Sequence, residues 1–373
     1  MILETELEPL SGSSVVTSGT PQRMALEWLA ASDPARLPLK NTPIDVITQR
    51  YVMATIYYAT GGPEWALQYN FLTGKETCDW NSQPQGVFCN NAGYITAIEL
   101  NNLNLKGELP KEIALLRQLE AIKIGGNKLS GKVPTELGLL SKLRVLHIGI
   151  NSFTGGIPTE LGGLPQLAIL DVSNNDFSGH LTGFITHIHS LESLDISHNG
   201  FSGELHKSFG NLKNLKVFKA SFNDFTSIIP TQLARMKILE EMYLNSNEFK
   251  ETLPEEFSGM QHLVTLDVSN NKLTGEIPVG FGYAKSLQAL SLSENQFSGG
   301  LFTDIGQLGS RLKELRLDNN NLKSFLPTEL RSLTNVIELN LEGNEFEGNI
   351  PSEIGECTGL KYLSVGNNKL FGN

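Results

Sequence analysis

The sequence predicts an α/β solenoid, a right-handed coil of stacked repeats with a parallel β-sheet on its concave face and a helical cap at its N-terminal end. Three observations predict this fold. From Ile95 onward the pattern L-x-x-L-x-L-x-x-N-x-L/F-x-G-x-I/L-P recurs to the end of the 373-residue chain. The repeated asparagine returns every 24 residues, with a single step of 25 after Asn295. The stretch before Ile95 lacks the pattern, and a fixed period of this length is typical of solenoids.

Composition narrows the classes of protein to which the chain can belong. Apolar residues make up 40% of the chain and charged residues 18%, which is enough for a large core. The formal net charge of −11 and the absence of a Lys/Arg-rich run argue against nucleic-acid binding. The longest apolar stretch, YVMATIYYATGG, is too short to cross a bilayer, so we expect no membrane span within this chain.

Residues 1–19 are expected to form a disordered leader. They are acidic and rich in serine and glycine, and they lack the basic start and apolar run of a signal peptide. A cytosolic protein, a trimmed chain and an incomplete N-terminus are all consistent with such a start, and the sequence does not choose among them.

Residues 20–92 are expected to form a helical N-terminal cap. Thr20-Pro21 and Thr42-Pro43 each place a threonine N-cap before a proline at the first helical position. The second predicted helix is apolar along one face and stops at Gly61. The first repeat of a solenoid has no neighbour on one side, so its leucine core needs such a cover.

Residues 93–373 contain about twelve repeats. In each, the alternation L-x-x-L-x-L predicts a short strand with one buried face. Stacking pairs these strands into a parallel sheet over a continuous leucine core, and segments such as TELGLLSKL close the coil as loose helical turns on its convex side. The G-x-I/L-P element favours a second bend and a short extended piece. Ser227, Glu251 and Ser324 replace its glycine and are expected to weaken the second strand locally.

The repeated asparagine is expected to have a structural role. After each strand the chain turns inward, which would leave backbone N–H and C=O groups buried and unpaired. An asparagine amide has two donor hydrogens and an acceptor oxygen, so a column of asparagines can satisfy these groups along the stack. We call this column the asparagine ladder; its members are Asn127, Asn151, Asn175, Asn199, Asn223, Asn247, Asn271, Asn295, Asn320, Asn344 and Asn368.

The repeats resemble the plant-type leucine-rich repeat over residues 93–373. The segment CDWNSQPQGVFCN, residues 78–90, resembles the N-terminal cap of plant-type leucine-rich repeat receptors. That resemblance implies a disulfide between Cys78 and Cys89 and packing of Trp80 on the core. Two reduced, buried thiols are the alternative. The third cysteine, Cys357, is expected to be a buried core thiol.

A disulfide would place the protein in an oxidising compartment. We therefore expect an extracellular or cell-surface location, with or without an anchoring membrane helix outside this chain. The absence of any N-x-S/T glycosylation sequon points the other way, so a cytoplasmic location stays open.

We expect no enzymatic activity, no cofactor and no metal site. Five of the seven histidines lie between His180 and His206, but the repeat register places them in different columns and on different sides of the coil. They therefore do not converge as metal ligands do. No nucleophile–base pair or carboxylate dyad stands out from the scattered acidic residues.

A ligand is expected on the concave sheet face, where outward-pointing residues have no packing role. The residue between the second and third leucines forms a column with neighbours about 5 Å apart. The column reads Lys123, His147, Asp171, Asp195, Lys219, Tyr243, Asp267, Ser291, Arg316, Asn340, Ser364. The residue before each ladder asparagine is usually small or polar, but Ile150 and Phe222 are not, and an exposed aromatic is a reasonable anchor. We predict a ligand-binding patch formed by His147, Ile150, Asp171, Asp195, His198, Lys219, Phe222, Tyr243 and Asp267.

Two further expectations concern this patch and its partner. The alternative for the patch is that its residues only solvate the sheet, or that Phe222 packs on a neighbour. Acidic residues in the C-terminal half of the face predict a preference for a basic partner that weakens with salt. These residues are Glu241, Asp267, Glu294, Glu314, Asp318, Glu338 and Glu342.

The expected function is that of a receptor-like recognition module for a protein, peptide or glycan. One alternative is an inhibitor of a secreted wall-degrading enzyme, similar to the polygalacturonase inhibitors, and another is a structural cell-surface protein. Those inhibitors also carry a C-terminal disulfide-bonded cap. This chain ends within a repeat at GNNKLFGN, which counts against the inhibitor.

Overall fold

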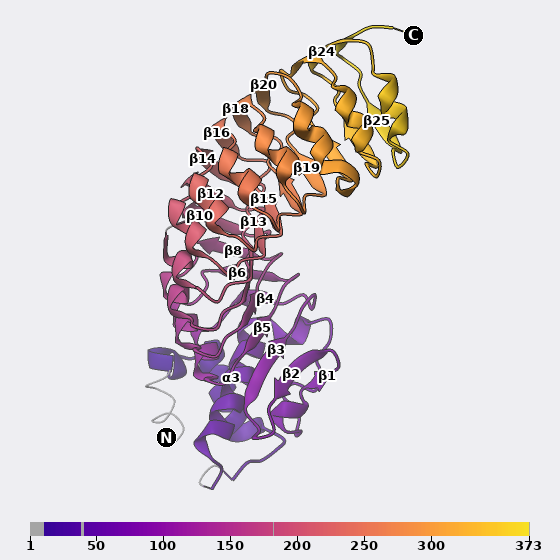
Figure 1. Ribbon diagram of the computed structural model, residues 1–373. Helices are drawn as coiled ribbons and strands as arrows, with labels where there is room; N and C mark the ends of the chain where they lie inside the picture. Colours follow the sequence, from indigo (N-terminus) through magenta and orange to yellow (C-terminus); the bar gives the residue numbers. More distant parts are fainter. Residues whose placement is uncertain (1–10, 39–40, 182, 373) are drawn as a thin grey trace. The chain divides into compact units, whose positions relative to one another are not determined.

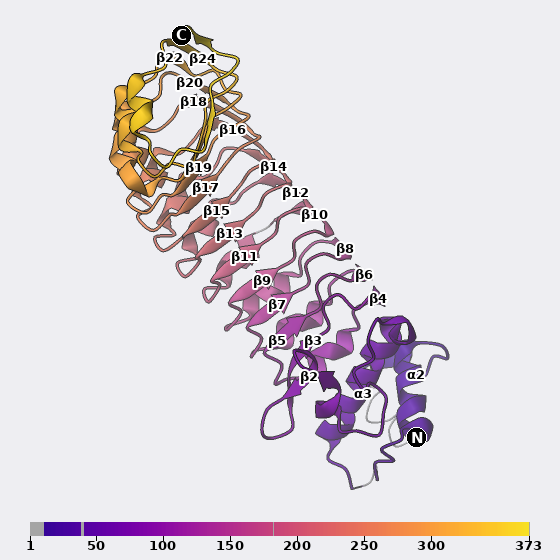
Figure 2. The same ribbon diagram turned by 90° about the vertical axis from the view of Figure 1, so that its right-hand side faces the viewer.

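The computed structural model describes residues 11–38, 41–181 and 183–372, and it divides into two compact units, residues 1–178 (unit 1) and 179–373 (unit 2). Both units are built from the same turn of chain. In each turn a main-sheet strand, a second-sheet strand and a 3₁₀-helix follow one another. Figure 1 shows the 3₁₀-helices stacked along one side of each unit, and Figure 2 shows the main-sheet strands lying side by side. The predicted repeat solenoid is confirmed.

Unit 1 begins with the predicted helical cap. Its helices are η1 (Gly12–Val15), α2 (Pro21–Glu27), the π-turn η2 (Trp28–Ser32), α3 (Ile44–Ala59), η3 (Gly62–Glu64) and η4 (Thr77–Asp79). Helix α3 packs against α2 on one side and against the 3₁₀-helix of the first repeat on the other. It therefore covers the end of the leucine core, as the sequence predicts.

The starts of the two α-helices differ. Thr20 caps α2 as predicted, because its hydroxyl accepts a hydrogen bond from the Arg23 backbone N–H at 3.2 Å. The predicted Thr42 cap is wrong by one residue: Pro43 is extended, with ψ of 137°, and α3 begins at Ile44. The Thr42 hydroxyl instead donates to a backbone carbonyl upstream of the helix.

The expected leader is ordered in its second part. Val15 is fully buried, and the Ser11 hydroxyl is hydrogen-bonded to the Tyr51 hydroxyl at 2.9 Å. The prediction of disorder therefore does not hold for residues 11–19, because Val15 gives this short segment an apolar contact. Residues 1–10 lie outside the described part of the chain.

One buried ion pair joins the parts of the cap. Arg50 donates to both carboxylate oxygens of Asp33, at 2.5 and 2.6 Å, and both side chains are only 2% exposed. The guanidinium also donates to the Thr73 carbonyl and lies 5.2 and 4.8 Å from the ring centres of Trp28 and Trp80. A buried charge is stable only when paired and hydrogen-bonded, and Arg50 is both.

The predicted disulfide between Cys78 and Cys89 is present. Trp80, between them, is fully buried, with ring centres 6.0 Å from Trp28 and 5.1 Å from Phe71. The two cysteines flank β1 (Asn81–Ser82) and most of β2 (Gln85–Cys89), which pairs antiparallel with β3 (Ile95–Glu99), the first strand of the repeats. The cap thereby covers the open edge of the main sheet as well as the end of the core.

The main sheet is parallel from β3 onward within unit 1 and throughout unit 2. In unit 1 the strands after β3 are β5 (Ala121–Lys123), β7 (Val145–His147) and β9 (Ile169–Asp171). In unit 2 the strands are β11 (Ser193–Asp195), β13 (Val217–Lys219), β15 (Glu241–Tyr243), β17 (Thr265–Asp267), β19 (Ala289–Ser291), β21 (Glu314–Arg316), β23 (Glu338–Asn340) and β25 (Tyr362–Ser364).

A second set of short strands follows the main strands. These are β4 (Lys106–Glu108), β6 (Lys128–Gly131), β8 (Ser152–Gly155), β10 (Asp176–His180), β12 (Gly200–Glu204), β14 (Asp224–Ser227), β16 (Glu248–Thr252), β18 (Lys272–Glu276), β20 (Gln296–Ser298), β22 (Lys323–Phe325), β24 (Glu345–Gly348) and β26 (Lys369–Leu370). Strands β22, β24 and β26 form a sheet of their own. The break between β20 and β22 falls in the 25-residue step, where η13 is longer than the other repeat helices. The backbone N–H groups of Asn321 and Lys323 still bond the carbonyls of Phe297 and Gly299, both at 2.8 Å.

The predicted helical turns are 3₁₀-helices, one after each second strand from β4 to β24. They are η5 (Lys111–Leu115), η6 (Thr135–Leu139) and η7 (Thr159–Gly163) in unit 1, and η8 (Gly183–His187), η9 (Lys207–Asn211), η10 (Thr231–Arg235), η11 (Glu255–Gly259), η12 (Val279–Tyr283), η13 (Thr303–Arg311), η14 (Thr328–Ser332) and η15 (Ser352–Glu356) in unit 2. The backbone N–H of the residue after most of these helices bonds back to a carbonyl within it, which closes the turn. Cys357, directly after η15, is a buried free thiol, as predicted, and burial raises its pKa.

The asparagine ladder satisfies the inward turns as predicted. Asn223 donates to the carbonyls of Ile196, Ala220 and Ser221 at 3.0–3.3 Å, and its oxygen accepts the Phe201 backbone N–H at 3.0 Å. Each other ladder asparagine donates to at least two backbone carbonyls. One amide thus bonds the backbone of its own turn and of the preceding turn.

The second bend keeps its geometry where glycine is replaced. Ser227, Glu251 and Ser324 have φ of 74°, 64° and 86°, in the left-handed region that glycine occupies elsewhere. The second strands persist at Ser227 and Glu251, whereas β22, which contains Ser324, is only three residues long and begins a separate sheet. The predicted local weakening is therefore not general. The departures also cost backbone strain, of order 1 kcal/mol at each position.

Arg50→Met is expected to destabilise unit 1 by about 3–5 kcal/mol, because Asp33 would be left as an unpaired buried charge. Chemical denaturation measures the loss, and the double variant with Asp33→Leu should recover part of it. Lys272→Met, which removes an exposed ion pair with Glu248, is the matched control and should cost less than about 1 kcal/mol. Equal losses in both single variants would contradict a structural role for the buried pair.

Asn271→Leu is expected to destabilise unit 2 by roughly 2–3 kcal/mol, because the buried Phe249 backbone N–H loses its acceptor and the carbonyls of Leu244 and Val268 each lose one of two asparagine donors. Asn270→Gly is the control at the exposed neighbouring position, where φ is 52° and glycine is favoured. It should leave the denaturation midpoint unchanged or raise it. A Leu variant as stable as the control would show that the ladder does not hold the turns.

Candidate functional site

The exposed face of the main sheet, here called the sheet face, carries the predicted column of side chains. Lys123, His147 and Asp171 occupy equivalent places on neighbouring strands of unit 1. In unit 2 the strand register aligns Asp195, Lys219, Tyr243, Asp267, Ser291, Arg316, Asn340 and Ser364. The nine residues of the predicted patch fall in both units, so two groups of them are described.

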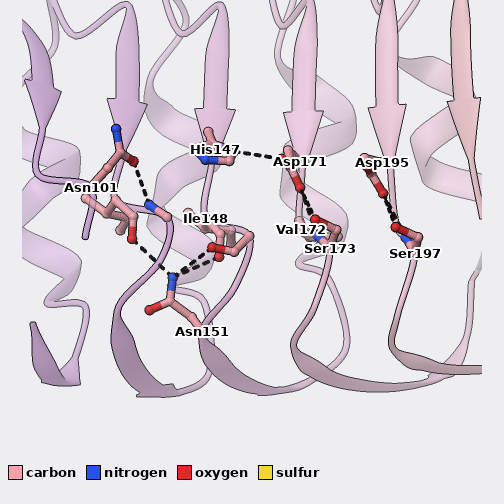
Figure 3. A network of polar contacts seen from close by, with 12 residues as sticks. Asn101, His147, Ile148, Asn151, Asp171, Val172, Ser173, Asp195 and Ser197 are labelled. Atoms are coloured by element: carbon pink, nitrogen blue, oxygen red, sulfur yellow. Dashed lines mark hydrogen bonds and ion pairs between the residues drawn. The ribbon is translucent and has the colours of Figure 1, made fainter. Parts of the chain in front are cut away.

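In unit 1, His147 and Asp171 form a close polar pair (Figure 3). The His147 Nδ1 lies 2.7 Å from one carboxylate oxygen of Asp171. The other oxygen accepts the backbone N–H and the hydroxyl of Ser173, at 2.9 and 2.7 Å. Burial alone would raise the pKa of Asp171, but the hydrogen bonds from His147 and Ser173 outweigh it and lower the pKa below its ordinary value. Asp171 is thus held as an anion on the sheet face.

Ile150 follows strand β7 and has a strained backbone. Its φ is 57° and its side chain is 60% exposed. The residue before the ladder asparagine has positive φ throughout the array, and Asn or Gly fills most of these places. A β-branched residue in the left-handed region is a genuine outlier. Such outliers cluster at functional sites, where another gain offsets the strain.

In unit 2, His198 and Phe222 occupy the same strained position in consecutive repeats. Their φ values are 52° and 54°. The two rings are stacked, with centres 4.2 Å apart and planes inclined by 11°. Phe222 therefore packs on a neighbour, as one alternative held, yet it is still 47% exposed. The stack presents an aromatic surface at the edge of the sheet face.

Charged groups surround this stack on the adjacent strands. The Lys219 Nζ lies 5.6 Å from the ring centre of Tyr243. Asp195 accepts the backbone N–H and hydroxyl of Ser197, at 3.0 and 2.5 Å. Asp267 is held by Ser269 in the same way. Burial raises the pKa of Tyr243, and the negative charge of Glu241 raises it further. The side chain therefore stays uncharged at neutral pH, with its hydroxyl protonated.

The serines that fix these aspartates were not part of the prediction. Ser173, Ser197 and Ser269 each stand two residues after an aspartate of the column. The recurring D-x-S triplet is a visible signal, because a hydroxyl two residues on can bond the carboxylate. Three carboxylates are thereby oriented in advance, which lowers the entropy that a ligand would otherwise cost on binding.

The acidic half of the sheet face contains one strong internal pair. Arg316 donates two hydrogen bonds of 2.8 Å to Glu338 and lies 3.6 Å from Glu314. The hydrogen bond to Glu338 is the main cause of its raised pKa. Glu342 accepts hydrogen bonds from the Ser364 hydroxyl and the Asn367 side-chain amide. Arg316 therefore offsets the negative charge of the predicted acidic stripe at Glu314 and Glu338. The other acidic residues of the stripe still make this half of the sheet face negative.

Among the described residues, no group of three or more His, Cys, Asp or Glu side chains is arranged to hold a metal ion. Within the same residues, no helix combines the length and the apolar character required to cross a membrane.

Comparison with known proteins identifies the family. Two models described as leucine-rich repeat match residues 189–249, 239–297, 311–333 and 335–357. The solved structure of a leucine-rich repeat protein from Leptospira interrogans, LIC12759, is 31% identical with a TM-score of 0.64, and the match covers 80% of this chain and 76% of that one. The chain belongs to the leucine-rich repeat family. Its repeats are of the plant type, as the sequence predicts. No curated protein matches the sequence.

Plant receptors are among the similar leucine-rich repeat structures. The PEPR1–AtPEP1 structure is 25% identical with a TM-score of 0.72, and the match covers 94% of this chain and 49% of that one. The plant peptide hormone receptor RGFR1 in complex with RGF2 is 29% identical with a TM-score of 0.60, and the match covers 74% of this chain and 51% of that one. This leucine-rich repeat chain thus spans about half the length of those two proteins.

Asp171→Asn is expected to destabilise this leucine-rich repeat array by roughly 1–2 kcal/mol at pH 7, because it removes charged hydrogen bonds. The lowered pKa gives stability that is present above the unfolded-state pKa of about 3.9 and is lost as pH falls through the folded-state value. The difference in the free energy of unfolding between wild type and variant should therefore shrink as the pH falls towards 3. Denaturation at both pH values measures it, with exposed Asp176→Asn as the control. A gap of the same size at pH 3 would contradict the pairing.

Proposed function

We propose that the chain is a non-enzymatic recognition module that binds a peptide or an extended segment of a protein along its sheet face. The stack of His198 on Phe222 carries this proposal. Both residues accept a strained backbone at a position where Asn and Gly are the usual choice, and neither ring is needed in the core. An aromatic surface beside oriented charges is the composition that binding hot spots favour.

The groups around the stack suggest how a ligand would be held. A peptide lying across the strands would place an apolar side chain on Phe222 and a basic side chain near Asp195 or Asp267, whose serine partners fix their carboxylates. Tyr243 offers its hydroxyl and ring face between them. On unit 1, His147, Ile150 and Asp171 offer the same combination of apolar and charged groups and are included in the proposal.

A receptor with a similar structure supports a peptide ligand. RGFR1 is a plant peptide hormone receptor in complex with RGF2, and its match covers 74% of this chain. We further propose an extracellular or cell-surface location for this chain. The Cys78–Cys89 disulfide supports it, because such bonds persist in oxidising compartments.

The decisive experiment pairs Phe222→Asn with Tyr243→Ala in the full chain. Asparagine favours the left-handed backbone, so the fold should be kept or slightly stabilised while the aromatic anchors are lost. Wild type and variant are used to capture proteins from the extracellular fraction of the source organism, and affinity for each captured partner is then measured. We expect the variant to lose about tenfold or more in affinity.

The matched control is Phe325→Ala, which removes an exposed aromatic from the second strand of a repeat, off the sheet face. It should bind the captured partner as wild type does. A partner that binds the double variant and wild type equally would refute the proposed site, and binding that does not weaken in higher salt would refute the role of the carboxylates.

A further inference from the structure

We propose a second binding surface, on the side of unit 2 away from the sheet face, that takes a segment of a partner protein with an apolar side chain flanked by lysine or arginine. The surface is a groove of about 440 Å³ over consecutive strands β14, β16 and β18, which lie side by side in Figure 1. Its floor is formed by the buried residues Ile229, Leu253 and Ile277. We call it the side groove, and a volume of this size accommodates one or two side chains of a partner.

Two apolar residues on the rim of the side groove depart from the repeat pattern. Val279 is 53% exposed and stands where the described residues of the other repeats are polar or glycine. Ile228 is 51% exposed, and in its column Phe325 is the only other apolar residue among those described. Neither residue contributes to the core of the coil. Their meeting at one groove is not required by the fold, and it creates an apolar surface open to solvent.

A third residue that departs from the repeat pattern lies in the same groove. Glu251 occupies the place of the repeat glycine with φ of 64°, so it strains the second bend that glycine would leave relaxed. Glu251 lines the groove together with Glu255, Glu256 and Glu276. No lysine or arginine is among the described residues that line it. The groove therefore combines an apolar floor and rim with uncompensated negative charge.

The charge decides which partner fits. A neighbouring groove shares Glu255 and Glu256 and brings Arg235 and Lys237 next to them, whereas Glu251 and Glu276 do not line that groove. A cation of the partner is therefore expected nearest Glu251 and Glu276. A second copy of this chain, with a net charge of −11, and an anionic membrane surface are both poorly matched to such a groove.

The test uses a labelled eight-residue peptide that alternates lysine with leucine, and fluorescence anisotropy with the full chain. Two matched peptides alternate lysine with serine and glutamate with leucine. We expect the lysine–leucine peptide to bind about tenfold more tightly than either, because it alone satisfies both the apolar floor and the carboxylates. In 0.5 M salt both lysine peptides should bind more weakly, but the lysine–leucine peptide should still bind more tightly than the lysine–serine peptide.

The groove variants restore the repeat pattern, so they keep the fold. Ile228→Thr with Val279→Thr should lower the affinity for the lysine–leucine peptide about tenfold. Glu251→Gly should lower it several-fold while raising the thermal midpoint, because the bend is relaxed. Glu204→Gln, at an acidic position outside the groove in the same unit, is the matched control and should change neither quantity.

The outcomes separate this proposal from that of the sheet face. The Phe222→Asn/Tyr243→Ala variant removes the anchors of the sheet face and leaves every groove residue in place. In that background the lysine–leucine peptide should still bind, and adding Ile228→Thr/Val279→Thr should still lower its affinity about tenfold. Equal affinity with and without the two threonines overturns the side groove. Complete loss of binding in the sheet-face variant also overturns it, as does a dimer of the wild-type chain that the threonine variants abolish.

Discussion

Every turn of both units depends on one hydrogen-bonding group, the side-chain amide of the ladder asparagine. Each repeat turns inward after its strand and exposes peptide groups to an interior of leucine and phenylalanine. The amide pairs those groups with its own turn and with the preceding one, so it acts within a repeat and between repeats at once. Because the asparagine side chain lies in the core, the residue before it has no packing role. His198 and Phe222 occupy this position and stack at the sheet face.

Both proposed surfaces include residues with a strained backbone. The residue before each ladder asparagine must take a left-handed backbone, which Asn and Gly adopt at little cost. Ile150, His198 and Phe222 adopt it at a cost, and so does Glu251 at the second bend. The same backbone occurs at Ser246, Glu294, Ser227 and Ser324, so strain alone does not identify a site. Ile150, Phe222 and Glu251 combine it with large exposed side chains on the two surfaces for which binding is proposed.

Periodicity predicted most of the fold because the interactions repeat with it. The ladder, the column of the sheet face, the cap disulfide and the buried Cys357 could all be placed from residue spacing and family resemblance. What spacing could not supply were contacts set by side-chain direction: the stacking of His198 on Phe222, the serines that hold the aspartates, and the groove formed where three departures from the pattern meet. The start of α3 was missed because a threonine–proline pair is compatible with capping at either residue.

The segments of the cap depend on one another more than the repeats do, as the contacts of Arg50 show. Its guanidinium reaches an aspartate, two tryptophans and a loop carbonyl from separate stretches of chain, so no one of these stretches has a stable partner without the others. Repeats can be added or removed singly, because each touches only its neighbours. The cap cannot be shortened in this way. Transplanting it onto a designed array would require moving the whole stretch from α2 to the second cysteine as a single graft.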